Sequence, residues 1–316
     1  MSRFKNVMLS TDFSSCSQHA KRYAYAFAKQ PNGILHIAHS VEVTPYPYSL
    51  VPEGGAILEE TLREIRSAAQ EQLDADVEEA KVAGVQTKGH LLEGYPPEKI
   101  DELALELGCD LLVVGTHGHS GLSHLVHGST CSKILRSSPA PVLSVKEAEH
   151  EFVDEEGHIN IKKVMCPVDF SSLSEEALPA AADICRRFEA SLLLFHVVDS
   201  RIEYPMLMSN TSMPMEAHLN ETSIVLLEKI QASLSDIETN IQVVMGVPGK
   251  EIIRVADEEN IDLVIMPTHG RQGLSHVLLG STAEKVATQA PCPVLTIKPQ
   301  LVLADIKQPV PDAVVI

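Results

Sequence analysis

The chain has 316 residues, which at ~150 residues per domain predicts two domains, each large enough to bury its own core. Its 43 acidic and 25 basic residues give a formal charge of −18, which repels phosphate backbones and argues against nucleic-acid binding. Hydrophobic residues make up 44% of the chain, too many for a disordered protein.

In chain order, the first half alternates short apolar runs with amphipathic patterns. The runs typical of buried strands are Val7–Leu9, Leu35–Val41, Val85–Leu92, Leu111–Val114 and Val142–Val145. Apolar residues recur at helical spacing from Leu58 to Ala80, and Pro96 is placed to open another helix. Asp12–Ser15 offers N-cap oxygens for the helix after the first strand. This alternation predicts a parallel sheet wrapped by helices.

The second half of the chain repeats the first. Lys5–Ser14 returns as Lys162–Ser171 at an offset of 157, and Ala140–Lys146 returns as Cys292–Lys298 at an offset of 152. This long period indicates a duplicated domain. The predicted boundaries are residues 1–147 and 161–299 for the two domains, 148–160 for an acidic linker and 300–316 for a tail. The carboxylates of the linker predict a solvated segment, and the tail is either an added edge strand or a loose end.

The cysteines and the apolar runs predict a location. Six cysteines are scattered without CxxC spacing, which is typical of small buried hydrophobes in a reducing compartment. No apolar run approaches the roughly 18 residues of a membrane span, and none near the N-terminus has signal length. We therefore expect a cytoplasmic protein without a membrane partner.

A glycine loop follows the fourth predicted strand of the first half, at the sheet edge where ligands of such folds bind. Gly115-Thr116-His117-Gly118 is followed by nine residues and then by Gly128-Ser129, which is placed to open a helix. Glycines let backbone N–H groups approach a ligand closely, and a helix N-terminus favours phosphate oxygens. The spacing is neither Walker A nor GxGxxG, and glycines needed only for turns or packing are the alternative.

The G-x2-G-x9-G-[ST] spacing, the Asp after the first strand and the closing Pro-Val-Leu strand resemble the universal stress protein family. Both halves carry the resemblance, as in tandem two-domain members, and only the linker and the tail fall outside it. The resemblance implies, in each half, a five-stranded parallel sheet sandwiched by helices, an α/β fold that is adenine nucleotide alpha hydrolase-like and Rossmann-like. It also implies a stress-response regulator that binds ATP or another adenine nucleotide with Mg or Mn.

The resemblance assigns site residues in both copies. In the first half, Asp12, with the adjacent Thr11, and the second-strand Ser40 are implied to contact the adenine; a helix N-cap is the alternative role of Asp12. The implied phosphate positions are Gly115, His117, Gly118, His119, Gly128, Ser129 and Thr130. The second-half set is Asp169, Val197, Thr268, His269, Gly270, Arg271, Gly280, Ser281 and Thr282.

The two copies differ within the loop. Pro267 replaces the first glycine, and proline removes an N–H donor and fixes φ. Arg271 gives the second copy a fixed cation where the first has His119. Ser281-Thr282-Ala283-Glu284 predicts a capping box that the first copy lacks. We therefore expect the first half to bind nucleotide and leave the second half open.

Histidines are the titratable cations of the first loop, which has no Lys or Arg between Gly115 and Ser129; they are His117, His119, His124 and His127. If they neutralise phosphate charge, nucleotide affinity rises as the pH falls from about 7.5 to about 6. Binding of a labelled ATP analogue across this range tests the hypothesis, and a flat affinity contradicts it. The alternative is that these histidines lie on the surface or pack the loop. A metal site is disfavoured, because the spacing of His119 and His124 suits no single helical face.

Three functions are carried forward. The first is the nucleotide-binding regulator, the second a slow ATP hydrolase, and the third a dimerisation scaffold with empty sites. Neither glycine loop contains a carboxylate, so we assign no catalytic residue and expect at most a weak ATPase. Val142–Val145 and Val294–Ile297 are expected to pair within the chain, and a homodimer is a further expectation.

Overall fold

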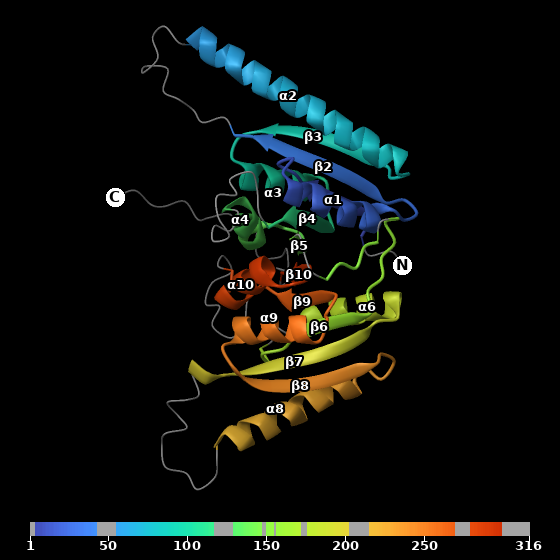
Figure 1. Cartoon of the computed structure of the whole chain (residues 1–316), viewed down its shortest axis with the longest axis vertical. Helices are drawn as coiled ribbons and strands as arrows, with labels where there is room; N and C mark the ends of the chain where they lie inside the picture. Colours follow the sequence, from blue (N-terminus) through green and yellow to red (C-terminus); the bar gives the residue numbers. More distant parts are fainter. Residues whose placement is uncertain are drawn as a thin grey trace, which may run out of the picture.

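The strands of the protein form one continuous sheet. The computed structural model describes residues 4–42, 55–116, 129–146, 150–154, 156–171, 176–201, 215–268 and 279–298. Ten strands follow one another in the order β3-β2-β1-β4-β5-β10-β9-β6-β7-β8. Figure 1 shows the sheet running along an elongated molecule, with α2 and α8 at opposite ends. Within the described residues, no helix is both long and apolar enough to cross a membrane.

Each half contributes five parallel strands. The first half comprises β1 (Asn6–Ser10), α1 (Ser15–Ala28), β2 (Ile34–Val41), α2 (Gly55–Val82), β3 (Thr87–Glu93), α3 (Pro96–Glu106), β4 (Leu111–Gly115), α4 (Ser129–Ser137) and β5 (Val142–Val145). The second comprises β6 (Lys163–Pro167), α6 (Ala177–Phe188), β7 (Ser191–Asp199), α8 (Met215–Ala232), β8 (Thr239–Gly246), α9 (Pro248–Glu258), β9 (Leu263–Pro267), α10 (Ser281–Gln289) and β10 (Val294–Ile297). The predicted α/β fold with two similar halves is confirmed.

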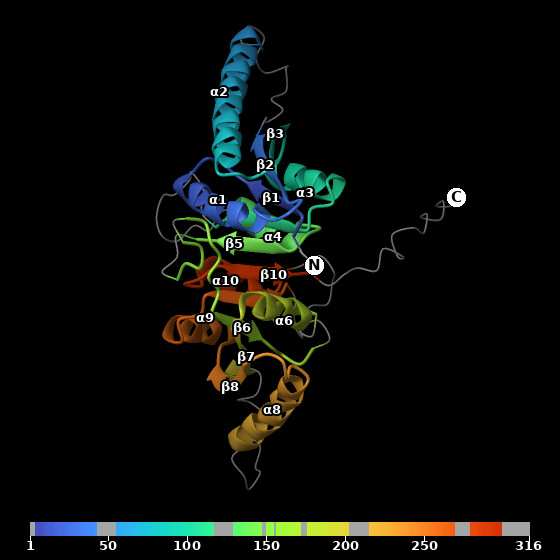
Figure 2. The ribbon, with the colours of Figure 1, turned by 90° about the vertical axis from the view of Figure 1, so that its right-hand side faces the viewer.

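Two apolar cores lie on the two faces of the sheet. Helices α1, α2, α6 and α8 pack on one core, and α3, α4, α9 and α10 pack on the other. In Figure 2, α1 and α2 lie to the left of the upper strands and α3 to the right, and the twist of the sheet brings α6 and α8 to the right of the lower strands. Alternate strand residues supply them, so Val7 and Leu9 enter the first core while Met8 enters the second. Each core contains residues of both halves. The continuous sheet thus extends both cores across the junction.

The two halves meet at β5 and β10, which pair antiparallel with Leu143 opposite Leu295. These two leucines are equivalent in the duplication, so the pairing has an approximate two-fold axis between them. The hydroxyls of Ser144 and Thr296, which are also equivalent, each donate across the junction to a backbone carbonyl, at 3.3 and 3.2 Å. The main-chain contact is thus nearly symmetric.

The segment between the halves is only partly solvated. The ring of Phe152 is buried and packs edge-on against Tyr23, with 4.9 Å between the ring centroids. The carboxylate of Glu151 lies 3.0 Å from a guanidinium nitrogen of Arg22 on α1. The predicted solvated linker is therefore wrong for this stretch and holds at its exposed tip near Asp154. A charge count overlooks the apolar residues inside the acidic run.

Candidate functional site

In each half the strand order reverses between the first and fourth strands, because β1 lies between β2 and β4, and β6 lies between β7 and β9. Ligands of open α/β sheets bind at this switch point, beyond the carboxyl ends of the strands. Ser10 pairs with Val114, so the residues that follow them, Thr11, Asp12 and Gly115, meet at one edge. We call this edge the first crevice; its counterpart after β6 and β9 is the second crevice.

Part of the predicted site lies outside the described residues. This part comprises His117, Gly118, His119, His124, His127, Gly128, His269, Gly270 and Arg271, together with the side chain of Ser129. Ser129 and Thr130 begin α4, and Ser281 and Thr282 begin α10.

The turn after β1 is held by side-chain oxygens. Oδ1 of Asp12 accepts hydrogen bonds from the backbone N–H and the hydroxyl of Ser14, at 3.1 and 2.5 Å. Ser14 is the N-cap of α1 and accepts from the N–H of Ser17 at 3.3 Å. The alternative in which Asp12 itself caps the helix is therefore wrong. Its carboxylate instead fixes the capping serine, and Phe13 closes the turn with a φ of 62°.

A histidine on β2 fixes the turn that follows β1. Nδ1 of His39 lies 2.8 Å from the carbonyl oxygen of Thr11, and its ring packs on Phe13 with 4.4 Å between the centroids. A carbonyl only accepts, so Nδ1 of His39 donates this hydrogen bond. The sequence contains a signal for this role, because His39 recurs as His196 at the offset of the strand–turn motif.

The second crevice has the same turn. Oδ1 of Asp169 accepts from the N–H and hydroxyl of Ser171, at 3.0 and 2.6 Å. Nδ1 of His196 lies 2.7 Å from the carbonyl oxygen of Val168, and its ring packs on Phe170 with 4.5 Å between the centroids. Phe170 also has a positive φ, 59°. The turn has therefore been kept in both copies.

Gly115 brings α1 against the end of β4. A Cβ at this position would lie 3.1 Å from Sγ of Cys16 and 3.2 Å from the backbone N of Ser17. The missing side chain thus lets the first turn of α1 reach the crevice. The equivalent residue is Pro267, which carries a side chain where the first half has none.

Ser40 lies near the end of β2, the strand that pairs with β1 on the side away from β4. Its hydroxyl donates to the carbonyl oxygen of Gly94 at 3.1 Å. This bond ties the end of β2 to the turn before α3. The equivalent Val197 has no hydroxyl, so the second half lacks this bond.

The start of α10 differs from its prediction. Gly280 is the N-cap and donates its N–H to the carbonyl oxygen of Thr268 at 2.8 Å, and no side chain of the described residues caps the helix. The predicted capping box of Ser281 and Glu284 is therefore wrong. Nη2 of Arg136 on α4 donates to both carboxylate oxygens of Glu284, at 2.7 and 2.9 Å, and so draws the carboxylate across the junction.

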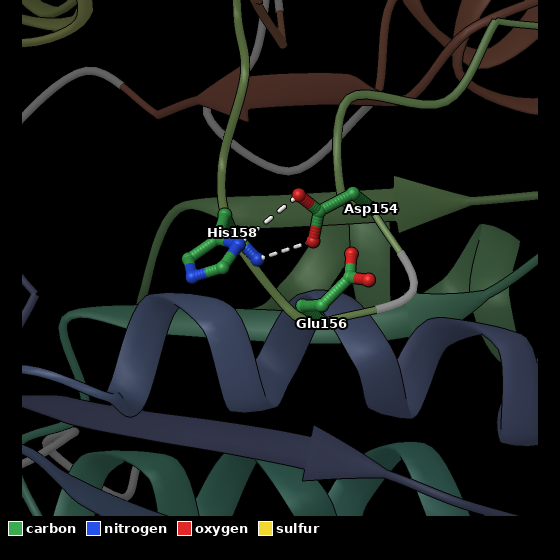
Figure 3. Close-up of side chains that lie close together, drawn as sticks. All are labelled: Asp154, Glu156 and His158. Atoms are coloured by element: carbon green, nitrogen blue, oxygen red, sulfur yellow. Dashed lines mark hydrogen bonds and ion pairs between the residues drawn. The ribbon is translucent and has the colours of Figure 1, made fainter.

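Metal-ligating side chains cluster elsewhere in the described part of the chain. Asp154, Glu156 and His158 lie together at the exposed tip of the linker (Figure 3). Oδ1 of Asp154 accepts from the backbone N–H of His158 at 2.7 Å, and Oδ2 lies 3.1 Å from its Nδ1. These hydrogen bonds hold the pKa of Asp154 below its ordinary value. The carboxylate therefore closes a turn, and nothing further points to a metal.

A histidine pair distinguishes the first half away from the crevice. Nδ1 of His36 on β2 lies 3.0 Å from Nε2 of His90 on β3. Burial, with smaller contributions from His90 and Lys88, lowers the pKa of His36 to about 4. The equivalent residues are Leu193 and Gln242, which do not titrate. Sequence spacing did not single out this pair, because the two residues lie on different strands.

Comparison with known proteins places both halves in one family. The model of the universal stress protein family matches residues 3–146 and 160–298. Universal stress protein E of Photorhabdus laumondii is 26% identical over 321 residues, which cover 95% of this chain and 96% of that protein. Universal stress protein A homolog 1 of Coxiella burnetii is 34% identical over 149 residues, which cover 45% of this chain and 96% of that protein.

Solved structures share the arrangement of the whole chain. A universal stress protein from Archaeoglobus fulgidus superposes with a TM-score of 0.62 over 94% of this chain and 99% of its own. Its sequence identity is 21%, so this likeness shows the fold alone.

Proposed function

This chain belongs to the universal stress protein family, and we propose that it binds ATP or another adenine nucleotide in its first crevice and acts as a stress-response regulator. One observation carries the proposal: the Asp12 turn, Gly115 and the N-terminal turn of α1 converge at the switch point of the sheet. This is the place where α/β folds hold nucleotides.

The adenine is assigned to the side of the crevice formed by Asp12 and the end of β2 at Ser40, and the phosphates to the side of Gly115 and α4. A divalent cation, Mg or Mn, fits best when carried on the phosphates. Among the described residues that close the first crevice, Asp12 is the one carboxylate, and its Oδ1 already accepts from Ser14. Magnesium commonly binds in this way, through substrate phosphates and water.

A second nucleotide in the second crevice is supported by the start of α10. The N-cap of this helix is Gly280, which has no side chain, and phosphate oxygens are suited to accept from the N–H groups of a first turn. Pro267 opposes binding, since it lacks an N–H donor and carries a side chain where the first half has Gly115.

The nucleotide released from the purified protein on heating tests the proposed function. ATP released intact supports the regulator, ADP alone supports slow turnover, and no nucleotide supports the empty scaffold. Equilibrium binding of a labelled ATP analogue by Asp12→Asn, with Asp169→Asn as the matched control, then assigns the site. We expect Asp12→Asn to weaken the tighter site and Asp169→Asn to leave it unchanged. Equal effects of the two variants would contradict the assignment to the first half.

We also place the protein in the cytoplasm. All six cysteines are free thiols, and five of them are buried. Such thiols persist where the compartment is reducing. Fractionation of cells with an antibody to the protein tests this location, and recovery from an oxidising compartment would contradict it.

A further inference from the structure

The junction between the halves is symmetric in its main chain but not in its charged side chains. The Ser144 hydroxyl also donates to the carbonyl oxygen of Ala287 on α10 at 2.9 Å. The backbone bonds of β5 and β10, and the bonds from Ser144 to Val294 and from Thr296 to Val142, occur as equivalent pairs. Contacts of this kind form equally well between two copies of the same half. They cannot distinguish a half from its duplicate.

The ion pair of Arg136 and Glu284 occurs once. In the repeat, Thr288 is the equivalent of Arg136, and Ser132 is the equivalent of Glu284. The reciprocal ion pair is therefore absent. Thr288 donates instead to the Glu284 carbonyl oxygen of its own helix, at 2.8 Å. The first half therefore presents the cation at this junction, and the second half presents the anion.

A second charged interaction at the junction does not select a partner. Asp101 on α3 and Lys298 after β10 interact electrostatically across the junction. The equivalent of Asp101 is Ile253, and the equivalent of Lys298 is Lys146. Two first halves would keep such an interaction twice, through Lys146, and two second halves would lose it twice, so mixed and like pairs have the same total. Discrimination therefore rests on Arg136 and Glu284.

We propose that the junction is an interaction surface that is selective for one partner. The α4–β5 face of the first half binds the α10–β10 face of the second half in preference to a second copy of itself. Two first halves would pair Arg136 with Ser132 and lose the Glu284 carboxylate. Two second halves would leave Glu284 opposite Thr288. The ion pair of Arg136 and Glu284 therefore directs the two halves toward each other, where the strands alone would allow any combination.

Partner choice can be measured after the chain has been cut. A protease site replaces Glu155, next to the exposed tip at Glu156, and the folded full-length protein is cleaved there. The cut protein is unfolded in denaturant and refolded by dilution, so that each half selects its partner again. Native mass spectrometry then counts mixed and like pairs. We expect mixed pairs to dominate, and a statistical mixture, with mixed pairs making up half, would overturn the proposal.

Exchanging residues between the halves tests whether Arg136 and Glu284 determine partner choice. Arg136→Thr with Glu284→Ser gives each half the residue of its duplicate, and we expect the share of mixed pairs to fall toward the statistical half. Arg254→Thr with Glu258→Ser removes the same charges from an ion pair within α9 and is the matched control. An unchanged share in the first variant, or an equal fall in the control, would overturn the role of the pair.

A second measurement uses the uncut chain and does not depend on refolding of the halves. Arg136→Glu and Glu284→Arg each place like charges at the junction, so each is expected to lower the unfolding midpoint. The double reversal restores opposite charges and is expected to recover most of the loss. A double variant as unstable as the sum of the two singles would show that the residues do not interact.

Discussion

The two crevices share one turn and differ in what approaches it. Both use an Asp–Ser turn, a phenylalanine with positive φ and a histidine bound to a backbone carbonyl. The first crevice adds the hydroxyl of Thr11 and the absent side chain of Gly115, where the second has Val168 and Pro267. Duplication has therefore preserved this turn and varied the residues beside it.

The linker provides the largest difference between the halves, because its buried ring packs on the first half. Phe152→Ala removes this ring from between Tyr23 and Phe27 and is expected to lower the free energy of unfolding by about 3–5 kcal/mol. Denaturant unfolding measures the change. Glu156→Ala at the exposed tip is the control and should change stability by less than about 0.5 kcal/mol. Equal effects would mean that the linker does not hold the first half.

The histidine pair of the first half should make the stability of the chain sensitive to acid. His36 has a pKa of about 4 when folded and 6.5 in its unperturbed form, so the unfolded chain binds more protons between these values. The free energy of unfolding therefore falls as the pH falls from about 6.5 to about 4, by at most about 3 kcal/mol. His36→Leu with His90→Gln installs the second-half residues and should remove this loss. His158→Gln, at the exposed tip, should not, and a pH profile unaltered by the double variant would refute the assignment.

Gly115→Ala tests whether α1 must touch β4. The added methyl meets the backbone of α1 at 3.2 Å, so the helix start must move. We expect a stability loss of about 1–3 kcal/mol and about tenfold weaker binding of a labelled ATP analogue. Gly249→Ala is the control, because its nearest neighbour is the flexible side chain of Lys285. Full affinity in Gly115→Ala would show that the close approach is not needed for binding.

Thr11→Val gives the first crevice the residue of the second and should have the smallest effect. It removes the hydroxyl that donates to Ser17 at 3.1 Å and accepts from the N–H of Phe13 at 3.0 Å. The expected loss is about 1 kcal/mol, measured by thermal unfolding. Thr11→Ser retains the hydroxyl and should recover most of it. If serine is no better than valine, the hydroxyl contributes little.

Local patterns predicted much of the architecture. Apolar runs marked the strands, and the repeated Asp–Phe–Ser motif placed equivalent turns at equivalent sheet edges. The failures are contacts between distant segments. Glu284 follows the spacing of a capping box, yet Arg136 from the other half takes its carboxylate. The burial of Phe152 could not be predicted from the acidic residues around it for the same reason, because neighbours far away in the chain determine its environment.

Because each core contains residues of both halves, unfolding of one half would expose apolar surface of the other at the junction. Heat or denaturant should accordingly unfold both halves in a single cooperative transition. A destabilising substitution in either half then lowers the stability of the whole molecule, and neither half unfolds while the other stays folded.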